Sequence, residues 1–78
     1  MIELLFFAQL QDVVGSSKLT IDATNISVKE IKDQFLSKYD MDEILDQSMV
    51  AVNEEYSKED AIVTSGDVVA FIPPVSGG

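Results

Sequence analysis

The sequence has 78 residues, 46% of them hydrophobic, so it is long enough for one small domain and too apolar for a disordered chain. It contains no cysteine and no histidine, which excludes disulfides, thiol nucleophiles, Ser–His sites and most zinc sites. The formal net charge of −9 argues against nucleic acids and anionic membranes as partners, and no apolar run reaches the roughly 20 residues that span a bilayer.

The first elements are predicted from an apolar run and from a short alternating segment. Residues 1–3 lack the basic region of a signal peptide, so we expect a cytoplasmic protein. Residues 2–8 are almost entirely apolar and predict a buried strand. Residues 10–14 predict one helical turn, which Gly15 ends. Residues 18–22 alternate between apolar and polar side chains, which indicates a half-exposed strand antiparallel to the first.

The main helix is predicted to begin at Val28. Ser27 and Glu30 form an S-x-x-E capping box, in which each side chain satisfies a free backbone N–H of the other residue. Ile26 and Ile31 have the spacing of a hydrophobic staple across this cap. Apolar residues then recur at helical spacing and predict one stripe that packs on a sheet: Val28, Ile31, Phe35 and Tyr39.

The second half of the chain predicts a short helix and three more strands. Residues 40–46 form an acidic stretch that favours the short helix. Residues 48–52 predict a third strand, and residues 53–55 a turn that leads to a brief fourth strand around Tyr56. Residues 68–72 predict the last strand, because a tight turn precedes them and two prolines follow.

The order of these elements predicts an α+β fold with the ubiquitin-like β-grasp arrangement. A mixed sheet of about five strands would wrap one main helix, with the first and last strands as parallel neighbours at its centre. We expect residues 1–72 to form this domain and residues 73–78 to form an extended carboxyl-terminal tail.

The tail is the candidate site of chemistry. Pro73 and Pro74 favour an extended exit from the sheet, and Gly77 and Gly78 lack the β-carbon that would keep them out of a narrow channel. A terminal carboxylate is a poor electrophile, so it would react only after ATP-dependent activation to an acyl-adenylate. Three products are then open: attachment to a lysine, attachment to a cysteine, or a thiocarboxylate that carries sulfur.

Three segments resemble the small subunit of molybdopterin synthase. They are LFFAQ at residues 5–9, AVN at residues 51–53 and GDVVAFIPPVSGG at residues 66–78. The resemblance covers the whole chain, and its closing motif is specific. One departure is Ile72, where members of that family often have a phenylalanine.

The resemblance implies a sulfur carrier without a catalytic site or bound cofactor of its own. A ubiquitin-activating-type adenylyltransferase would use ATP to adenylate Gly78, which is then converted to a thiocarboxylate. Val75, Ser76 and Gly77 would thread the tail into a pocket of the large subunit, where sulfur passes to cyclic pyranopterin monophosphate. The family also implies a heterotetramer with two copies of each subunit.

A partner surface is predicted from the two-residue period of the strands. If Ile2, Leu4 and Phe6 face the helix, the alternate residues of that strand point away from it. Together with the last strand and the start of the tail, they would form an exposed apolar patch, which often marks an interface. The predicted interface residues are Leu5, Phe7, Ala70, Ile72, Pro73 and Pro74.

Other interpretations of the sequence remain open. The thiamine-biosynthesis sulfur carrier shares the fold and the glycine end, and a ubiquitin-like protein modifier or binding module belongs to a different class. The acids of residues 40–46 and 54–60 lack the spacing of a calcium-binding loop, so we predict solvated surface and no metal site there. Tyr39 and Tyr56 are predicted to be packing residues.

Overall fold

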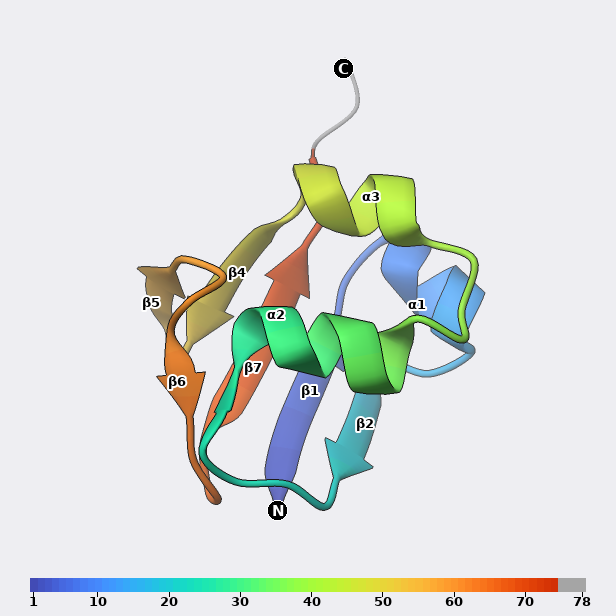
Figure 1. The fold of residues 1–78 in the computed structure, drawn as a ribbon. Coiled ribbons are helices and arrows are strands. Elements are labelled where there is room, and N and C mark those ends of the chain that lie inside the picture. Colours follow the sequence, from blue (N-terminus) through green and yellow to red (C-terminus); the bar gives the residue numbers. More distant parts are fainter. Residues whose placement is uncertain (75–78) are drawn as a thin grey trace.

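The computed structural model describes residues 1–74, and these form a sheet that packs against helices (Figure 1). Five strands make up one mixed sheet in the order β2-β1-β7-β4-β5. Their bounds are β1 (Ile2–Phe6), β2 (Lys18–Ile21), β4 (Met49–Val52), β5 (Glu55–Ser57) and β7 (Val68–Ile72). As predicted, β1 and β7 are parallel neighbours at the centre, and β2 runs antiparallel to β1. The β-grasp prediction is therefore confirmed.

The first strand is shorter than predicted, because the backbone turns sharply after it. β1 ends at Phe6, and Ala8 adopts a positive φ of 50° before helix α1 (Gln9–Val14) begins. Gly15 ends α1 as predicted. It has a left-handed φ of 85°, and its N–H donates to the Gln11 carbonyl at 2.8 Å.

The main helix begins at Val28 with the predicted capping box. The Glu30 N–H donates to Ser27 Oγ at 3.1 Å, and the Ser27 N–H donates to Glu30 Oε1 at 3.2 Å. The helix consists of α2 (Val28–Ile31) followed by a π-helical segment, η1 (Lys32–Leu36). The predicted staple residues Ile26 and Ile31 both belong to the buried core.

The π-helical segment corrects the predicted apolar stripe. Val28 and Ile31 are fully buried, but the next fully buried residue is Leu36, whereas Phe35 and Tyr39 are only half-buried. A π-helix has i→i+5 hydrogen bonds and a wider turn than an α-helix, so it places Leu36 below Ile31 on the face toward the sheet.

The remaining elements are a short helix and a second, two-stranded sheet. α3 (Asp42–Gln47) is the predicted short helix, with bounds shifted along the chain. A two-stranded ladder of β3 (Ile26–Ser27) and β6 (Ile62–Val63) was not predicted, because two-residue strands are too short to show an alternating pattern. The segment before β6 also supports the helix start, since the Val28 N–H donates to the Ala61 carbonyl at 3.0 Å.

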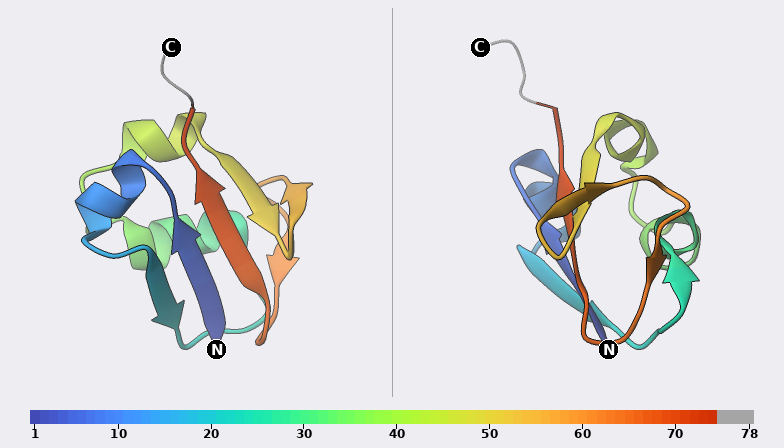
Figure 2. Two further views of the ribbon diagram at one scale, coloured as in Figure 1. Left: turned by 180° about the vertical axis from the view of Figure 1, so that it is seen from behind. Right: turned by 90° about the vertical axis from the view of Figure 1, so that its left-hand side faces the viewer.

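The core lies between the inner face of the sheet and the layer that contains α2 and α3, as the right-hand view of Figure 2 shows. The Phe6 and Phe71 rings stack there with centroids 5.7 Å apart. The two residues are register partners on the parallel strands β1 and β7. One face of the sheet is thus fully used by the core, which leaves the other face for interactions.

Candidate functional site

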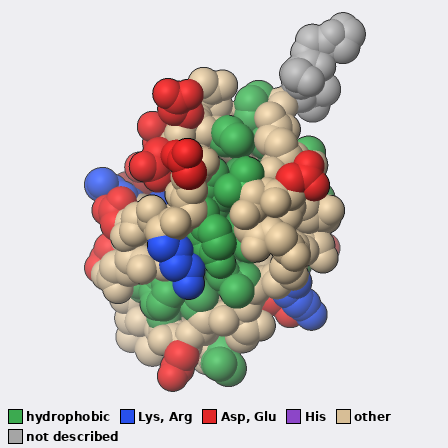
Figure 3. All heavy atoms as spheres, turned by 90° about the vertical axis from the view of Figure 1, so that its right-hand side faces the viewer, with side chains coloured by type: hydrophobic (Ala, Val, Ile, Leu, Met, Phe, Trp, Pro, Cys, Tyr) green, Lys and Arg blue, Asp and Glu red, His purple; other side chains and the backbone are tan. Residues whose placement is uncertain are grey.

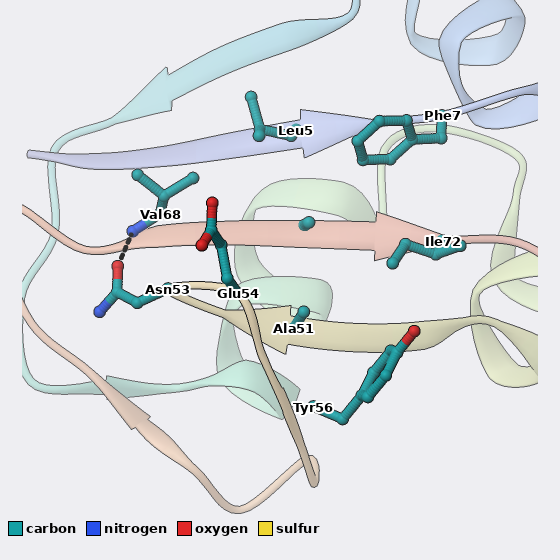
Figure 4. Close-up of a pocket in the computed structure, with 9 residues that line it drawn as sticks. Leu5, Phe7, Ala51, Asn53, Glu54, Tyr56, Val68 and Ile72 are labelled. Atoms are coloured by element: carbon teal, nitrogen blue, oxygen red, sulfur yellow. Dashed lines mark hydrogen bonds between the residues drawn. The ribbon is translucent and has the colours of Figure 1, made fainter.

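The outer face of the sheet carries an apolar groove that crosses β1, β7, β4 and β5 (Figure 4). Its volume is about 640 Å³. Seven of its nine lining side chains are apolar or aromatic; the lining residues are Leu5, Phe7, Ala51, Asn53, Glu54, Tyr56, Val68, Ala70 and Ile72. In the left-hand view of Figure 2, β1, β7 and β4 face the viewer and α1 lies to one side of them, so the groove on these strands is open to a partner.

Four of the predicted interface residues lie together in this groove. Leu5 and Ala70 are register partners on β1 and β7, Phe7 directly follows the end of β1, and Ile72 is the last residue of β7. Phe7 is 44% exposed, as expected for a side chain that points away from the core. The predicted geometry of the face is confirmed, whereas contact with a partner stays a prediction.

The two prolines after β7 differ from each other. Pro73 is buried, so its ring is not part of the open surface of the isolated chain, and Pro74 is exposed. β7 ends at Ile72, which is the last residue of the predicted domain. The other predicted tail residues, Val75, Ser76, Gly77 and Gly78, lie outside the described residues.

The structure adds residues to the groove that the sequence analysis did not assign to it. Tyr56 was predicted to be a packing residue, but it is 70% exposed and stands at the far side of the groove, so that prediction is wrong. Ala51 enters the groove because it pairs with both Tyr56 and Ala70. Met49 pairs with Ile72 and is 53% exposed, which extends the apolar surface near the end of β7.

A tight turn of Asn53 and Glu54 forms one end of the groove. Both residues have a positive φ, 51° and 70°, as a two-residue hairpin loop between β4 and β5 requires. Glycine is the favoured residue at the second position of such a loop, and a glutamate there costs about 1 kcal/mol of backbone strain. Glu54 therefore holds a backbone conformation that glycine would adopt more easily.

Asn53 joins this turn to the start of β7. The Asn53 N–H donates to the Val68 carbonyl at 2.8 Å, and the Val68 N–H donates to Asn53 Oδ1 at 3.0 Å, the dashed line in Figure 4. Asn53 Nδ2 also donates to Asp67 Oδ1 at 3.0 Å. These three bonds fix the turn at the end of the groove that is remote from the tail.

Asp67 is the ionisable residue of this hydrogen-bond network. Hydrogen bonds from the Thr64 backbone N–H and from the Asn53 side chain hold the pKa of its carboxyl below the ordinary value of 3.8. The Thr64 N–H donates to Asp67 Oδ2 at 2.9 Å. The charged carboxylate is therefore the form that stabilises the two turns.

We expect Asp67→Asn to lower the melting temperature at neutral pH and to have little effect in strong acid. Because the folded-state pKa is lowered, this stabilisation is present above pH 3.8 and is lost as the pH falls through the lowered value. Thermal unfolding over this pH range measures the gap between the two proteins, with Asp22→Asn at an exposed position as the control. A gap that stays the same at every pH would contradict this account.

On the face shown in Figure 3, most acidic side chains gather at the upper left and left, and apolar side chains reach the surface in the middle of this face. The acids of residues 40–46 and 54–60 are all exposed, as expected for solvated surface. Among residues 1–74, no three metal-binding side chains gather into a group that could hold a metal ion. None of the helices within residues 1–74 is long and apolar enough to cross a membrane.

Comparison with known proteins identifies the family. The model of the ThiS family matches residues 4–78 of the sequence. The chain belongs to the ThiS family. Two relatives of this ThiS-family chain are molybdopterin synthase sulfur carrier subunits, which bears out the resemblance seen in the sequence. The one from Drosophila simulans is 36% identical, with 99% of this chain and 90% of the relative covered. The one from Escherichia coli K12 is 33% identical, and both chains are covered completely.

Solved structures show the same fold as this member of the ThiS family. SAMP1 from Haloferax volcanii is 26% identical and superimposes with a TM-score of 0.84, covering 99% of this chain and 98% of the other. Subunit 1 or 2 in the complex of the two subunits of the molybdopterin-converting factor from Helicobacter pylori is also 26% identical. There the TM-score is 0.71, and the match covers 99% of this chain and 97% of that one.

Proposed function

We propose that this chain is the sulfur carrier subunit of molybdopterin synthase and acts in the cytoplasm. The observation that carries the proposal is the match over the whole length to relatives of that name, at 36% and 33% identity. The sequence features of the tail support the same function, since the family match extends to residue 78 and includes Gly77 and Gly78.

The proposed chemistry begins at the carboxylate of Gly78. One of its oxygens attacks the α-phosphate of ATP on a ubiquitin-activating-type adenylyltransferase, and pyrophosphate leaves. Hydrosulfide released by a donor then attacks the acyl carbon, the bond to AMP breaks, and a proton is lost, which leaves a thiocarboxylate on Gly78. Because the chain has neither cysteine nor histidine, we propose that its partners supply the catalytic groups and that it binds no cofactor of its own.

The proposed recipient is the large subunit of molybdopterin synthase. The outer face of the sheet would dock against it, while Val75, Ser76 and Gly77 lead the thiocarboxylate into its pocket, where sulfur passes to cyclic pyranopterin monophosphate. A fold match to a chain in the Helicobacter pylori complex of subunits 1 and 2 supports such a partner. We propose an assembly with two copies of each subunit.

Intact-mass analysis tests the proposed function. The protein is incubated with the adenylyltransferase, ATP and a sulfur donor, then weighed and digested. We expect the mass to rise by the difference between one sulfur and one oxygen atom, with the change confined to the carboxyl-terminal peptide. The same reaction without ATP is the control. An unchanged mass after activation that consumes ATP would contradict the sulfur-carrier proposal.

Protein modification is the second candidate function. It is favoured by the superposition on SAMP1 from Haloferax volcanii, a small archaeal modifier protein, with a TM-score of 0.84. A modifier forms isopeptide bonds to lysines of other proteins, so its conjugates survive boiling in detergent and thiol reductant. Detection of such conjugates in cells that express the chain would support protein modification. The mass measurement then decides whether the chain also carries sulfur.

A further inference from the structure

The groove on the outer face has two chemically different ends. Phe7 and Ile72 form the apolar end, next to the point where the chain leaves β7 toward the tail. Glu54 lies at the other end, beside Val68 at the start of β7 (Figure 4). Val68 and Ile72 are four positions apart on one extended strand, which corresponds to about 13 Å at roughly 3.3 Å per residue.

The backbone conformation and exposure of Glu54 favour contact with a partner over a role in folding. It occupies a left-handed position that favours glycine, with φ of 70°, and it is exposed. Three ion pairs occur within residues 1–74, and none of them includes Glu54. Its carboxylate thus stands over an apolar surface without a cation from the described part of its own chain.

The turn that carries Glu54 is held in place before any partner arrives. The bonds from Asn53 to Val68 and Asp67 tie it to β7, the same strand that leads to the tail. A charge held by a fixed backbone loses little conformational freedom on binding, so its contribution to recognition is larger than that of a charge on a loose loop. The rigid link to β7 also relates the position of Glu54 to the direction of the tail.

We propose that Glu54 is a specificity-determining residue that pairs with a lysine or arginine side chain of the docked partner. The occupant of the groove is a segment of the large subunit that combines an apolar side chain, placed against Phe7, with a basic residue about 13 Å away at Glu54. The net charge of −9 favours a basic partner surface. Two contacts at opposite ends of the groove fix the rotation of the carrier on its partner and so aim the tail. The identity of this partner rests on the proposed function.

Charge variants at Glu54 test the proposal by calorimetric titration of the large subunit. Glu54→Lys is expected to weaken binding at least tenfold, and Glu54→Gln to weaken it less and to reduce its dependence on salt. Glu54→Gly removes the charge but relieves the strained φ, so it should also weaken binding while the melting temperature stays the same or rises. Weaker binding by this better-folded variant would separate recognition from stability.

Glu55 provides the matched control, because it is an exposed acid next in sequence that does not line the groove. Glu55→Lys changes the net charge by the same amount and should alter affinity less than twofold. Equal effects of the two lysine variants, or full affinity of Glu54→Gly, would overturn the role of Glu54 and leave the carrier function standing. Failure of the unaltered chain to bind the large subunit would overturn the proposed function, and this inference with it.

Discussion

Deletion of Gly78 is expected to abolish sulfur transfer to the pterin precursor while the melting temperature stays nearly unchanged. The proposed reaction needs an activated carboxylate on a residue slender enough to enter the partner's pocket, and glycine has no side chain to obstruct it. Within residues 1–74, the hydrophobic core is built from residues between Ile2 and Phe71, so we expect it to stay intact when Gly78 is deleted. Single-turnover conversion of cyclic pyranopterin monophosphate measures the activity, and thermal unfolding measures the stability.

Two further variants separate the need for a correctly placed carboxylate from the need for a narrow tail. One extra residue after Gly78 should prevent transfer, because the carboxylate then belongs to a different residue at a different depth. Gly77→Val keeps the carboxylate but adds a branched side chain, so it should permit adenylation less well and transfer hardly at all. Sulfur delivery by a chain without Gly78 would refute the proposed mechanism, whatever the fold.

Phe7→Ala is expected to weaken binding to the large subunit by 2 kcal/mol or more, which corresponds to about thirtyfold in affinity. Phe7 is 44% exposed in the isolated chain and lies at the apolar end of the groove, so docking would bury a large aromatic surface. Buried aromatic side chains commonly dominate the binding energy of interfaces. Isothermal titration calorimetry measures the change, and the melting temperature should fall little because Phe7 is outside the core.

Val13→Ala is the control for this experiment. Val13 is a hydrophobic residue of similar exposure, 38%, but it lies on α1 and does not line the groove. Its truncation should leave the affinity unchanged. If Phe7→Ala and Val13→Ala bound equally well, the outer face of the sheet would not be the docking surface.

Much of the fold could be predicted because local chemistry and global topology agree. The capping box at Ser27 and Glu30 marks the helix start without any tertiary information, and the prolines after Ile72 mark the end of the last strand. The alternation that begins in β1 correctly predicts that Leu4 and Phe6 face the core and that Leu5 and Phe7 point away from it. These features depend only on residues close together in the sequence.

The features that were missed depend on contacts between distant segments. Tyr56 is one aromatic residue in a three-residue strand, and its face is determined only when Ala51 pairs with it and with Ala70. Leu36 enters the core through a π-helical turn that an ordinary helical period does not predict. The role of Glu54 in the groove requires a turn conformation that its own side chain disfavours. A single sequence gives no information on these contacts between distant segments or on the backbone conformations that they stabilise.

The parallel pairing of β1 and β7 also determines how the molecule bears mechanical load. The amino end of β1 and the carboxyl end of β7 lie at opposite ends of this central strand pair (Figure 1). Tension between the two ends therefore runs along the paired strands, from Glu3 and Val68 to Phe6 and Phe71, and loads the ladder bonds together in shear. Bonds loaded together resist more force than bonds opened one after another, so the ladder between β1 and β7 opposes a pull on the end of β7 as a whole.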